Sequence, residues 1–230
     1  MIKKNQFVAI EGLDGSGKST QIELLLTHLH NKGIETRFIH FPRHNDGVFG
    51  TLISKFLRGE FGNVNQVHPQ LVALLFAEDR KDFAKTIREW LSKGYFILVD
   101  RYVLSNIAFQ CAKTKDIKEK RELAEWINVF EYEYNNIPKP DLSLFLDVPF
   151  SFTQKSLEAR MAVYERDYLN GQDDIHEKDF ALQKAVKEEY ENMLELDKSI
   201  TGIKCYNAYN EIKSIAEIHS QIVALIENVM

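Results

Sequence analysis

The sequence predicts a doubly wound α/β fold, in which a five-stranded parallel sheet carries helices on both faces. Short apolar segments alternate with longer segments of helical periodicity along the 230 residues. The apolar segments are continuous, as is typical of strands that are buried on both faces of a parallel sheet. No internal repeat and no Gly/Ser-rich linker divides the chain. We therefore expect a single domain that spans residues 1–230.

Five segments are predicted as strands because each is short, apolar and bounded by turn-forming or polar residues. The first ends at a glycine-rich turn, the second at Pro42, and the fourth follows Pro138 and Pro140, which end the preceding helix. In chain order, the expected strands are residues 7–10, 36–41, 95–99, 142–146 and 203–206.

Helices are predicted between these strands. The first places Ile22, Leu25 and Leu29 on one face, and Gly33 just after its last turn is a common stop signal. The expected helices are residues 18–32, 50–57, 69–93, 101–113, 117–134 and 151–160, a helix that ends at residue 196, and residues 215–229.

Composition restricts the class of protein. Hydrophobic residues make up 44% and charged residues 27% of the chain, as in soluble globular proteins. The net charge of −5 gives no indication of a nucleic acid or a membrane surface as partner. Cys111 and Cys205 form no CxxC motif, and no apolar stretch suits a signal peptide or a membrane helix. We therefore expect a cytoplasmic protein with reduced thiols.

The strongest functional motif follows the first predicted strand. Residues 12–19 read GLDGSGKS and match GxxxxGK[ST], the phosphate-binding loop (P-loop). Its glycines let backbone N–H groups surround phosphates, and the start of the next helix adds positive potential. Lys18 is expected to reach the β- and γ-phosphates, and the Ser19 hydroxyl to bind Mg²⁺. The fold class narrows to a P-loop NTPase fold, with ATP contacts at Gly12, Leu13, Asp14, Gly15, Ser16, Gly17, Lys18, Ser19 and Thr20.

A second motif, Asp100-Arg101-Tyr102, directly follows the third strand. Ligands of open α/β sheets bind beyond the carboxyl ends of the strands. Asp100 is expected there to hold Mg²⁺, partly through water, or to orient an acceptor phosphate, and Arg101 to bind phosphate. An ion pair that closes the strand is the alternative. A GTPase is disfavoured, because NKGI at residues 31–34 does not match NKxD and no strand ends in DxxG.

Several segments together resemble the thymidylate kinase family. They are IEGLDGSGKSTQ at residues 10–21, FPR at 41–43, LFAEDR at 75–80, DRY at 100–102, and KPD at 139–141 with the strand to Leu146-Asp147. They occur in the family's order and cover nearly the whole chain, whereas many enzyme families share the P-loop alone. The resemblance implies transfer of the γ-phosphoryl group of ATP, bound with Mg²⁺, to dTMP, which gives dTDP and ADP. It also implies a homodimer.

The resemblance assigns residues to the acceptor site. Phe76 and Arg80 are four residues apart on one predicted helix and share a face. The resemblance implies that Phe76 stacks on thymine and that Arg80 donates hydrogen bonds to it. For Phe109, a place in the hydrophobic core is the alternative to its implied contact with the deoxyribose. The other implied contacts are Asp14 with the sugar, Arg43 and Arg101 with the phosphate, Ser105 and Asn106 with thymine, and Phe109 beneath the deoxyribose, where a 2′-hydroxyl would clash.

The polar residues 160–178 resemble the family's mobile lid. Arg160 is expected against adenine, and Arg166 over the phosphates, where it would stabilise transition-state charge while water is excluded. Some family members have an arginine where this chain has Gly15, so the lid is expected to supply that charge. Lys155 is an alternative to either lid arginine, and an exposed loop without a catalytic part is the alternative for the whole segment.

Two other functions remain open. A deoxynucleoside kinase or another monophosphate kinase would share the P-loop, but Arg43 and Arg101 favour an acceptor that already bears phosphate. A catalytically silent nucleotide-binding regulator would be free to lose residues such as Lys18 and Asp100, and the chain retains both. No HExxH motif surrounds His176-Glu177, so the expected metal is the Mg²⁺ that is carried with ATP.

Overall fold

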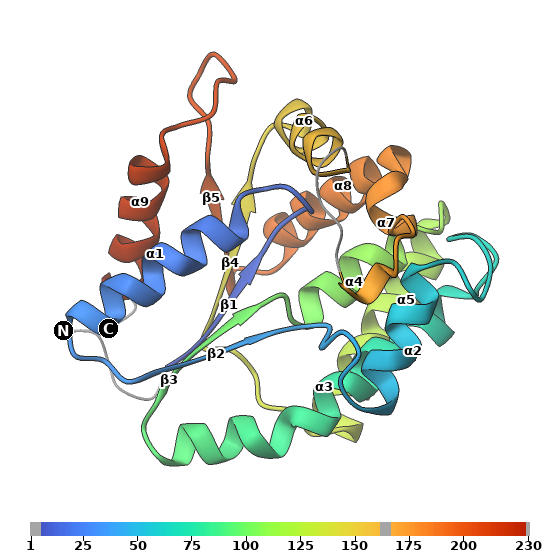
Figure 1. Ribbon diagram of the computed structural model, residues 1–230, viewed down its shortest axis with the longest axis horizontal. Coiled ribbons are helices and arrows are strands. Elements are labelled where there is room, and N and C mark those ends of the chain that lie inside the picture. Colours follow the sequence, from blue (N-terminus) through green and yellow to red (C-terminus); the bar gives the residue numbers. More distant parts are fainter. Residues whose placement is uncertain (1–5, 162–166, 229–230) are drawn as a thin grey trace.

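The computed structural model describes residues 6–161 and 167–228, and there five parallel strands form one sheet between two layers of helices (Figure 1). The strand order is β2-β3-β1-β4-β5. The predicted fold class is confirmed. The strands are β1 (Phe7–Glu11), β2 (Thr36–His40), β3 (Phe96–Asp100), β4 (Leu142–Asp147) and β5 (Ile200–Lys204).

The helices divide between the two faces of the sheet (Figure 1). One face carries α1 (Lys18–Asn31) and α9 (Ile215–Asn228), and the other carries α3 (Pro69–Ser92), α4 (Val103–Cys111) and α5 (Ile117–Asn128). In the described part of the chain, every helix is too short or too polar to span a bilayer. The remaining helical segments are α2 (Gly47–Leu57), η1 (Val129–Tyr134), α6 (Phe150–Met161), η2 (Asp167–Leu169), α7 (Ile175–Lys178) and α8 (Phe180–Leu196).

The central strands are buried on both faces, which explains their continuous apolar sequences. Val8 of β1 belongs to a cluster with Leu25 of α1 and Ile222 of α9. The next residue, Ala9, faces the opposite side and belongs to a cluster with Ile87 of α3. Full burial of a large apolar side chain contributes about 1.5–3 kcal/mol. The alternation along β1 therefore anchors both helix layers to one strand.

The register of β1 and β3 positions the two motifs side by side. Ile10 pairs with Asp100, and the backbone N–H of Arg101 donates to the Ile10 carbonyl. The chain leaves β1 toward β2 but leaves β3 toward β4, which lies on the other side of β1. The loops after β1 and β3 therefore diverge and leave a crevice at the carboxyl edge of the sheet, where ligands of such folds bind.

Several boundaries differ from the prediction, and α2 begins at Gly47 rather than at residue 50. Helix α4 begins at Val103 rather than at Arg101, because Arg101 has a left-handed φ of 66°. The helix predicted for residues 117–134 changes at Val129 from α-helix to the π-helical segment η1. Strand β5 begins three residues before its predicted start, and its Gly202 weakens the strand signal. A Cβ atom at Gly202 would lie 3.2 Å from Cδ1 of Leu194 in α8, so the glycine allows close packing there.

Candidate active site

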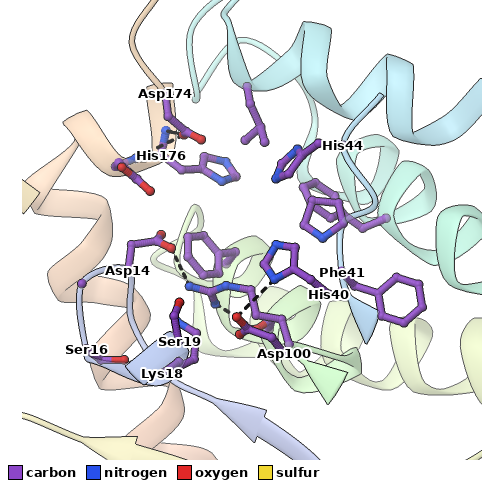
Figure 2. Close-up of a pocket in the computed structure, with 18 of the residues that line it drawn as sticks. Asp14, Ser16, Lys18, Ser19, His40, Phe41, His44, Asp100, Asp174 and His176 are labelled. Atoms are coloured by element: carbon purple, nitrogen blue, oxygen red, sulfur yellow. Dashed lines mark hydrogen bonds and ion pairs between the residues drawn. The ribbon is translucent and has the colours of Figure 1, made fainter. Parts of the chain in front are cut away.

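A cavity of about 320 Å³ opens at the carboxyl edge of the sheet, a size suited to small-molecule ligands (Figure 2). The P-loop, α3, α4 and the segment around α7 line it. Most residues that were predicted for the site meet there. They are Asp14, Gly15, Ser16, Gly17, Lys18, Ser19, Thr20, Phe76, Arg80, Asp100, Arg101, Ser105, Asn106, Phe109 and Arg160.

Lys18 lies folded against the P-loop backbone. Its Nζ donates to the carbonyls of Gly12 at 3.2 Å and Leu13 at 2.8 Å. Those two residues contribute backbone to the loop without being among the residues that line the cavity. Burial lowers the pKa of Lys18 to about 8, and the charge of Arg101 adds to this, against the opposing charges of Asp100 and Asp14. An anionic ligand would favour the charged ammonium and raise the pKa again.

The P-loop has no room for a side chain at Gly15. Its φ is 75°, and a Cβ atom there would lie 3.0 Å from Cβ of Ser156 in α6. An arginine at this position would require α6 to shift. Arg160, at the end of the same helix, lines the cavity, whereas Lys155 is exposed. Arg166 lies outside the described residues.

Asp100 presents one carboxylate oxygen that has no hydrogen-bond partner in the described part of the chain. Its Oδ2 lies 3.2 Å from Nδ1 of His40, at the end of β2. Burial raises the pKa of Asp100, but the hydrogen bond from His40 and the charge of Lys18 outweigh it, so the pKa is lowered. Its Oδ1 is buried without a hydrogen-bond partner among the described residues. Carboxylate, hydroxyl and water oxygens suit Mg²⁺, so Asp100 and the cavity-lining hydroxyl of Ser19 fit a hydrated ion.

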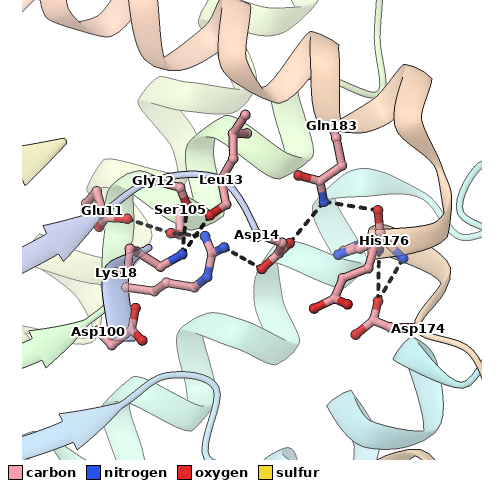
Figure 3. Close-up of polar contacts among 12 residues, drawn as sticks. Glu11, Gly12, Leu13, Asp14, Lys18, Asp100, Ser105, Asp174, His176 and Gln183 are labelled. Atoms are coloured by element: carbon pink, nitrogen blue, oxygen red, sulfur yellow. Dashed lines mark hydrogen bonds and ion pairs between the residues drawn. The ribbon is translucent and has the colours of Figure 1, made fainter. Parts of the chain in front are cut away.

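Arg101 joins Asp14 of the P-loop to Ser105 of α4. Figure 3 shows these two partner side chains. Its Nη2 donates to Oδ1 of Asp14 at 2.7 Å and its Nη1 to Oγ of Ser105 at 3.0 Å. The Asp14 carboxylate also accepts from Nε2 of Gln183 in α8. Burial alone would raise the pKa of Asp14. The charges of Arg101 and Lys18, together with the hydrogen bonds to the carboxylate, have the larger, opposite effect, so the pKa lies below its usual value. The pair is therefore ionised, and its guanidinium is oriented from two sides.

Glu11 holds Ser105 and the backbone of Tyr102 in place beside Arg101, a role that sequence analysis missed. Its carboxylate accepts from Oγ of Ser105 at 2.5 Å, from the hydroxyl of Tyr190 at 2.9 Å and from the backbone N–H of Tyr102 at 2.9 Å. Burial raises the pKa of Glu11. The hydrogen bond from Ser105 and the charge of Arg101 lower it, but by less, so the pKa stays above its usual value. The signal in the sequence was a carboxylate at the end of a buried strand.

Arg43 is not brought to the cavity. Its Nε donates to Oδ1 of Asp79 at 2.9 Å, and its Nη1 to Oδ2 of Asp46 at 2.9 Å. The cavity wall at this position is formed by Phe41, Pro42 and His44. In this arrangement the Arg43 guanidinium contacts Asp79 on α3 and Asp46 instead of lining the cavity.

Two buried residues of the segment around α7 also line the cavity, and sequence analysis missed both. Asp174 caps α7: its Oδ1 accepts from the backbone N–H of His176 at 2.8 Å, and its Oδ2 accepts from the hydroxyl of Tyr168 at 2.9 Å. His176 stacks on Phe109 with ring centroids 5.1 Å apart. Burial lowers the pKa of His176 well below its usual value, so the ring is neutral. In the sequence, Asp174 was an ordinary member of a polar stretch, and His176 was considered only as a zinc ligand and rejected.

Stability should depend on pH through Asp174. Burial, with the charges of Glu177 and Asp14, raises the pKa of Asp174 from 3.8 to about 7. The folded state thus favours the protonated carboxyl, and ionisation destabilises it as pH rises from about 4 to about 7. Asp174→Asn keeps the cap without the charge, so its free energy of unfolding relative to the original chain should rise by roughly 2 kcal/mol from pH 5 to pH 8.

Urea unfolding at the two pH values measures this difference. Asp173→Asn is the control, because that side chain is 60% exposed and pairs with Lys178 at the surface. It should show no such change with pH. A gap between Asp174→Asn and the original chain that is equal at both pH values would contradict the prediction.

Comparison with known proteins gives consistent matches. A family model described as thymidylate kinase matches residues 10–216. A probable thymidylate kinase from Thermococcus kodakarensis is 32% identical over 97% of this chain and 98% of its own length. The thymidylate kinase of Schizosaccharomyces pombe is 31% identical over 100% of this chain and 96% of its own. The structure of thymidylate kinase from Candida albicans superposes with a TM-score of 0.69 at 26% identity, and covers 99% of this chain and 93% of that one.

Proposed function

Because the chain belongs to the thymidylate kinase family, we propose that it transfers the γ-phosphoryl group of MgATP to dTMP and produces dTDP and ADP. The observation that carries this proposal is that the P-loop, Arg101 and Phe76 all line one cavity. ATP can bind on the P-loop side of Arg101, and an acceptor with a planar base can bind on the Phe76 side. The motif resemblance noted in the sequence is confirmed by the family model.

On the donor side, the P-loop N–H groups and Lys18 bind the phosphates of ATP. Lys18 exchanges its two carbonyl partners for phosphate oxygens, which compensate for its burial better than neutral acceptors do. Asp100 and Ser19 hold Mg²⁺, partly through water. The ion, when bound, neutralises charge on the phosphates.

On the acceptor side, Arg101 binds the dTMP phosphate. A phosphate oxygen of dTMP attacks the γ-phosphorus of ATP in line, without a phosphoenzyme, and Arg101 neutralises negative charge during this step. Its partner Asp14 accepts a hydrogen bond from the sugar hydroxyl. Phe109 lies beneath the deoxyribose, where a 2′-hydroxyl would clash. Its ring centroid lies 5.1 Å from that of His176 and 5.2 Å from Cζ of Arg101, and these contacts hold the ring in place.

The segment 160–178 serves in this proposal as the lid. Arg160 contacts adenine, and Arg166 stabilises charge on the transferring group. Support comes from the cavity, which Arg160, Tyr168 and His176 all line. We also propose a cytoplasmic homodimer, with a subunit interface at helices that flank the sheet. The side chains of Leu71 on α3 and Tyr134 on η1 are exposed by 61% and 74% and offer apolar surface for it.

Arg43 should matter for stability and little for turnover. Arg43→Met leaves the carboxylate of Asp79, which is 1% exposed, without its cation. Breaking a buried pair in this way costs about 3 kcal/mol. We expect that loss in urea unfolding and a change in kcat/KM for dTMP of less than about threefold, because the guanidinium does not line the cavity. A large rise in the KM for dTMP would instead restore Arg43 as a phosphate ligand.

The function is tested by ADP release from MgATP with dTMP, dUMP, other nucleoside monophosphates and thymidine. We expect the highest turnover with dTMP, weak turnover with dUMP and none with thymidine. Turnover with thymidine would identify a nucleoside kinase and contradict the role of Arg101. Binding of ATP without turnover of any acceptor would favour a silent regulator.

A further inference from the structure

Glu131 is a buried carboxylate that holds two of the cavity-lining residues. It is fully buried and accepts from Nε and Nη2 of Arg80, both at 2.5 Å. Its Oε1 also accepts from Nδ2 of Asn106 at 2.9 Å. The three side chains come from α3, α4 and η1. One carboxylate thus orients a guanidinium and an amide that are 26 positions apart in the sequence.

A local change of helix type accompanies this contact. Helix α5 ends at Asn128, and η1 continues as a π-helix over Val129–Tyr134. A π-helical turn rotates the residues that follow it relative to an α-helix, and such turns occur often at functional sites. Glu131 lies inside η1 and points into the protein, whereas its neighbour Glu133 is exposed.

The hydrogen bonds to Glu131 determine which polar atoms remain for a ligand. Nδ2 of Asn106 donates to Glu131 and to the Ala73 carbonyl, and both partners are acceptors only. The amide orientation is thereby set, and its Oδ1 is buried without a partner among the described residues. Within the same residues, Nη1 of Arg80 makes no hydrogen bond, since Glu131 takes Nε and Nη2. Both side chains line the cavity.

We propose that Glu131 is a positioning residue for base specificity, which presents one donor from Arg80 and one acceptor from Asn106 to the base. Thymine offers the complementary edge, an acceptor at O4 and a donor at N3–H. Cytosine offers the reverse, a donor at N4 and an acceptor at N3. A cytosine would therefore leave both protein groups facing like groups, and buried groups without partners cause strong rejection. The inference rests on the proposed function.

Glu131→Gln separates this role from simple packing. The glutamine has nearly the same volume but only one acceptor oxygen and an NH₂ group. It cannot accept from Nε and Nη2 of Arg80 and from Nδ2 of Asn106 together. Either Arg80 loses a hydrogen bond and its fixed orientation, or the Asn106 amide turns over and presents a donor to the base. Both outcomes weaken the preference for thymine over cytosine.

The test compares dTMP with 5-methyl-dCMP, which has the same shape and methyl group but the reversed hydrogen-bonding edge. For Glu131→Gln, we expect the ratio of kcat/KM values for dTMP over 5-methyl-dCMP to fall by about 10- to 100-fold. The change should lie mainly in the KM for dTMP. Glu133→Gln, an exposed neighbour in η1, is the matched control and should keep the original ratio.

The proposal would be overturned if folded Glu131→Gln kept the original ratio, including through equal losses for both substrates. An ion pair with a structural role alone would affect both substrates equally. Should Glu131→Gln fail to fold, Glu131→Asp gives the same test. It keeps the negative charge but withdraws the carboxylate from Arg80 and Asn106 by one methylene, and the ratio should fall likewise. Absence of dTMP turnover in the original chain would overturn the proposed function, and the inference with it, before any variant is compared.

Discussion

Lys18→Ala is expected to lower the kcat for phosphoryl transfer by about 1000-fold while the protein stays folded. Removal of one preorganised charge from a transition-state site costs roughly 100- to 1000-fold, and Lys18 serves both the β- and γ-phosphates in the proposed mechanism. The residue is 7% exposed and lies between the P-loop backbone and the carboxylates of Asp14 and Asp100. A mobile surface lysine would not replace it.

The same substitution, Lys18→Ala, should not lower the free energy of unfolding. The pKa of Lys18 is lowered to about 8, so the folded state disfavours its charged form. For a base with a lowered pKa, this cost is present at pH 7 and disappears as pH rises above about 8. Lys18→Ala removes the cost, so its unfolding free energy at pH 7 should equal or exceed that of the original chain.

Coupled ADP release measures the turnover, and urea unfolding measures the stability. Lys118→Ala is the control: that side chain on α5 is 85% exposed, and its pair with Glu122 lies at the surface. It should leave both quantities nearly unchanged. Near-normal turnover in Lys18→Ala would contradict the proposed mechanism.

Arg101→Met is expected to lower kcat/KM for dTMP by about 1000-fold and to destabilise the protein by about 3 kcal/mol. The loss of activity follows from removal of the bidentate phosphate ligand. The loss of stability follows from Asp14, whose ionised carboxylate would keep only the hydrogen bond from Gln183. Steady-state kinetics with dTMP and urea unfolding measure the two losses.

Arg43→Met provides the comparison, since it also breaks an ion pair with a carboxylate, and Arg43 does not line the cavity. Both variants should lose similar stability, and only Arg101→Met should lose activity. Equal activity in the two variants would show that the effect of Arg101 is structural. Arg101→Lys should recover stability better than activity, because a lysine keeps the charge but not the two-nitrogen geometry.

Much of the fold was determined by local sequence. The apolar run of β3 and the short β1 are recognisable because each must be buried on both faces. Strand β5 was displaced in the prediction because it is an edge strand with Gly202 inside it. The π-helical segment η1 was not predicted, since no local sequence signal distinguished it from a continued α-helix.

For the site, chain order was enough to predict that the P-loop and Asp100 reach the carboxyl edge of the sheet. The P-loop and Asp100 each follow a buried strand directly, and parallel strands end at the same edge, so their meeting followed from chain order. The pairing of the charged side chains, by contrast, depends on how the helices pack. Arg80 meets Glu131 across 51 residues and Arg101 meets Asp14 across 87, while Asp79 withdraws Arg43 from the cavity. A buried charge must find its partner wherever the packed helices bring one, and no local pattern encodes that partner.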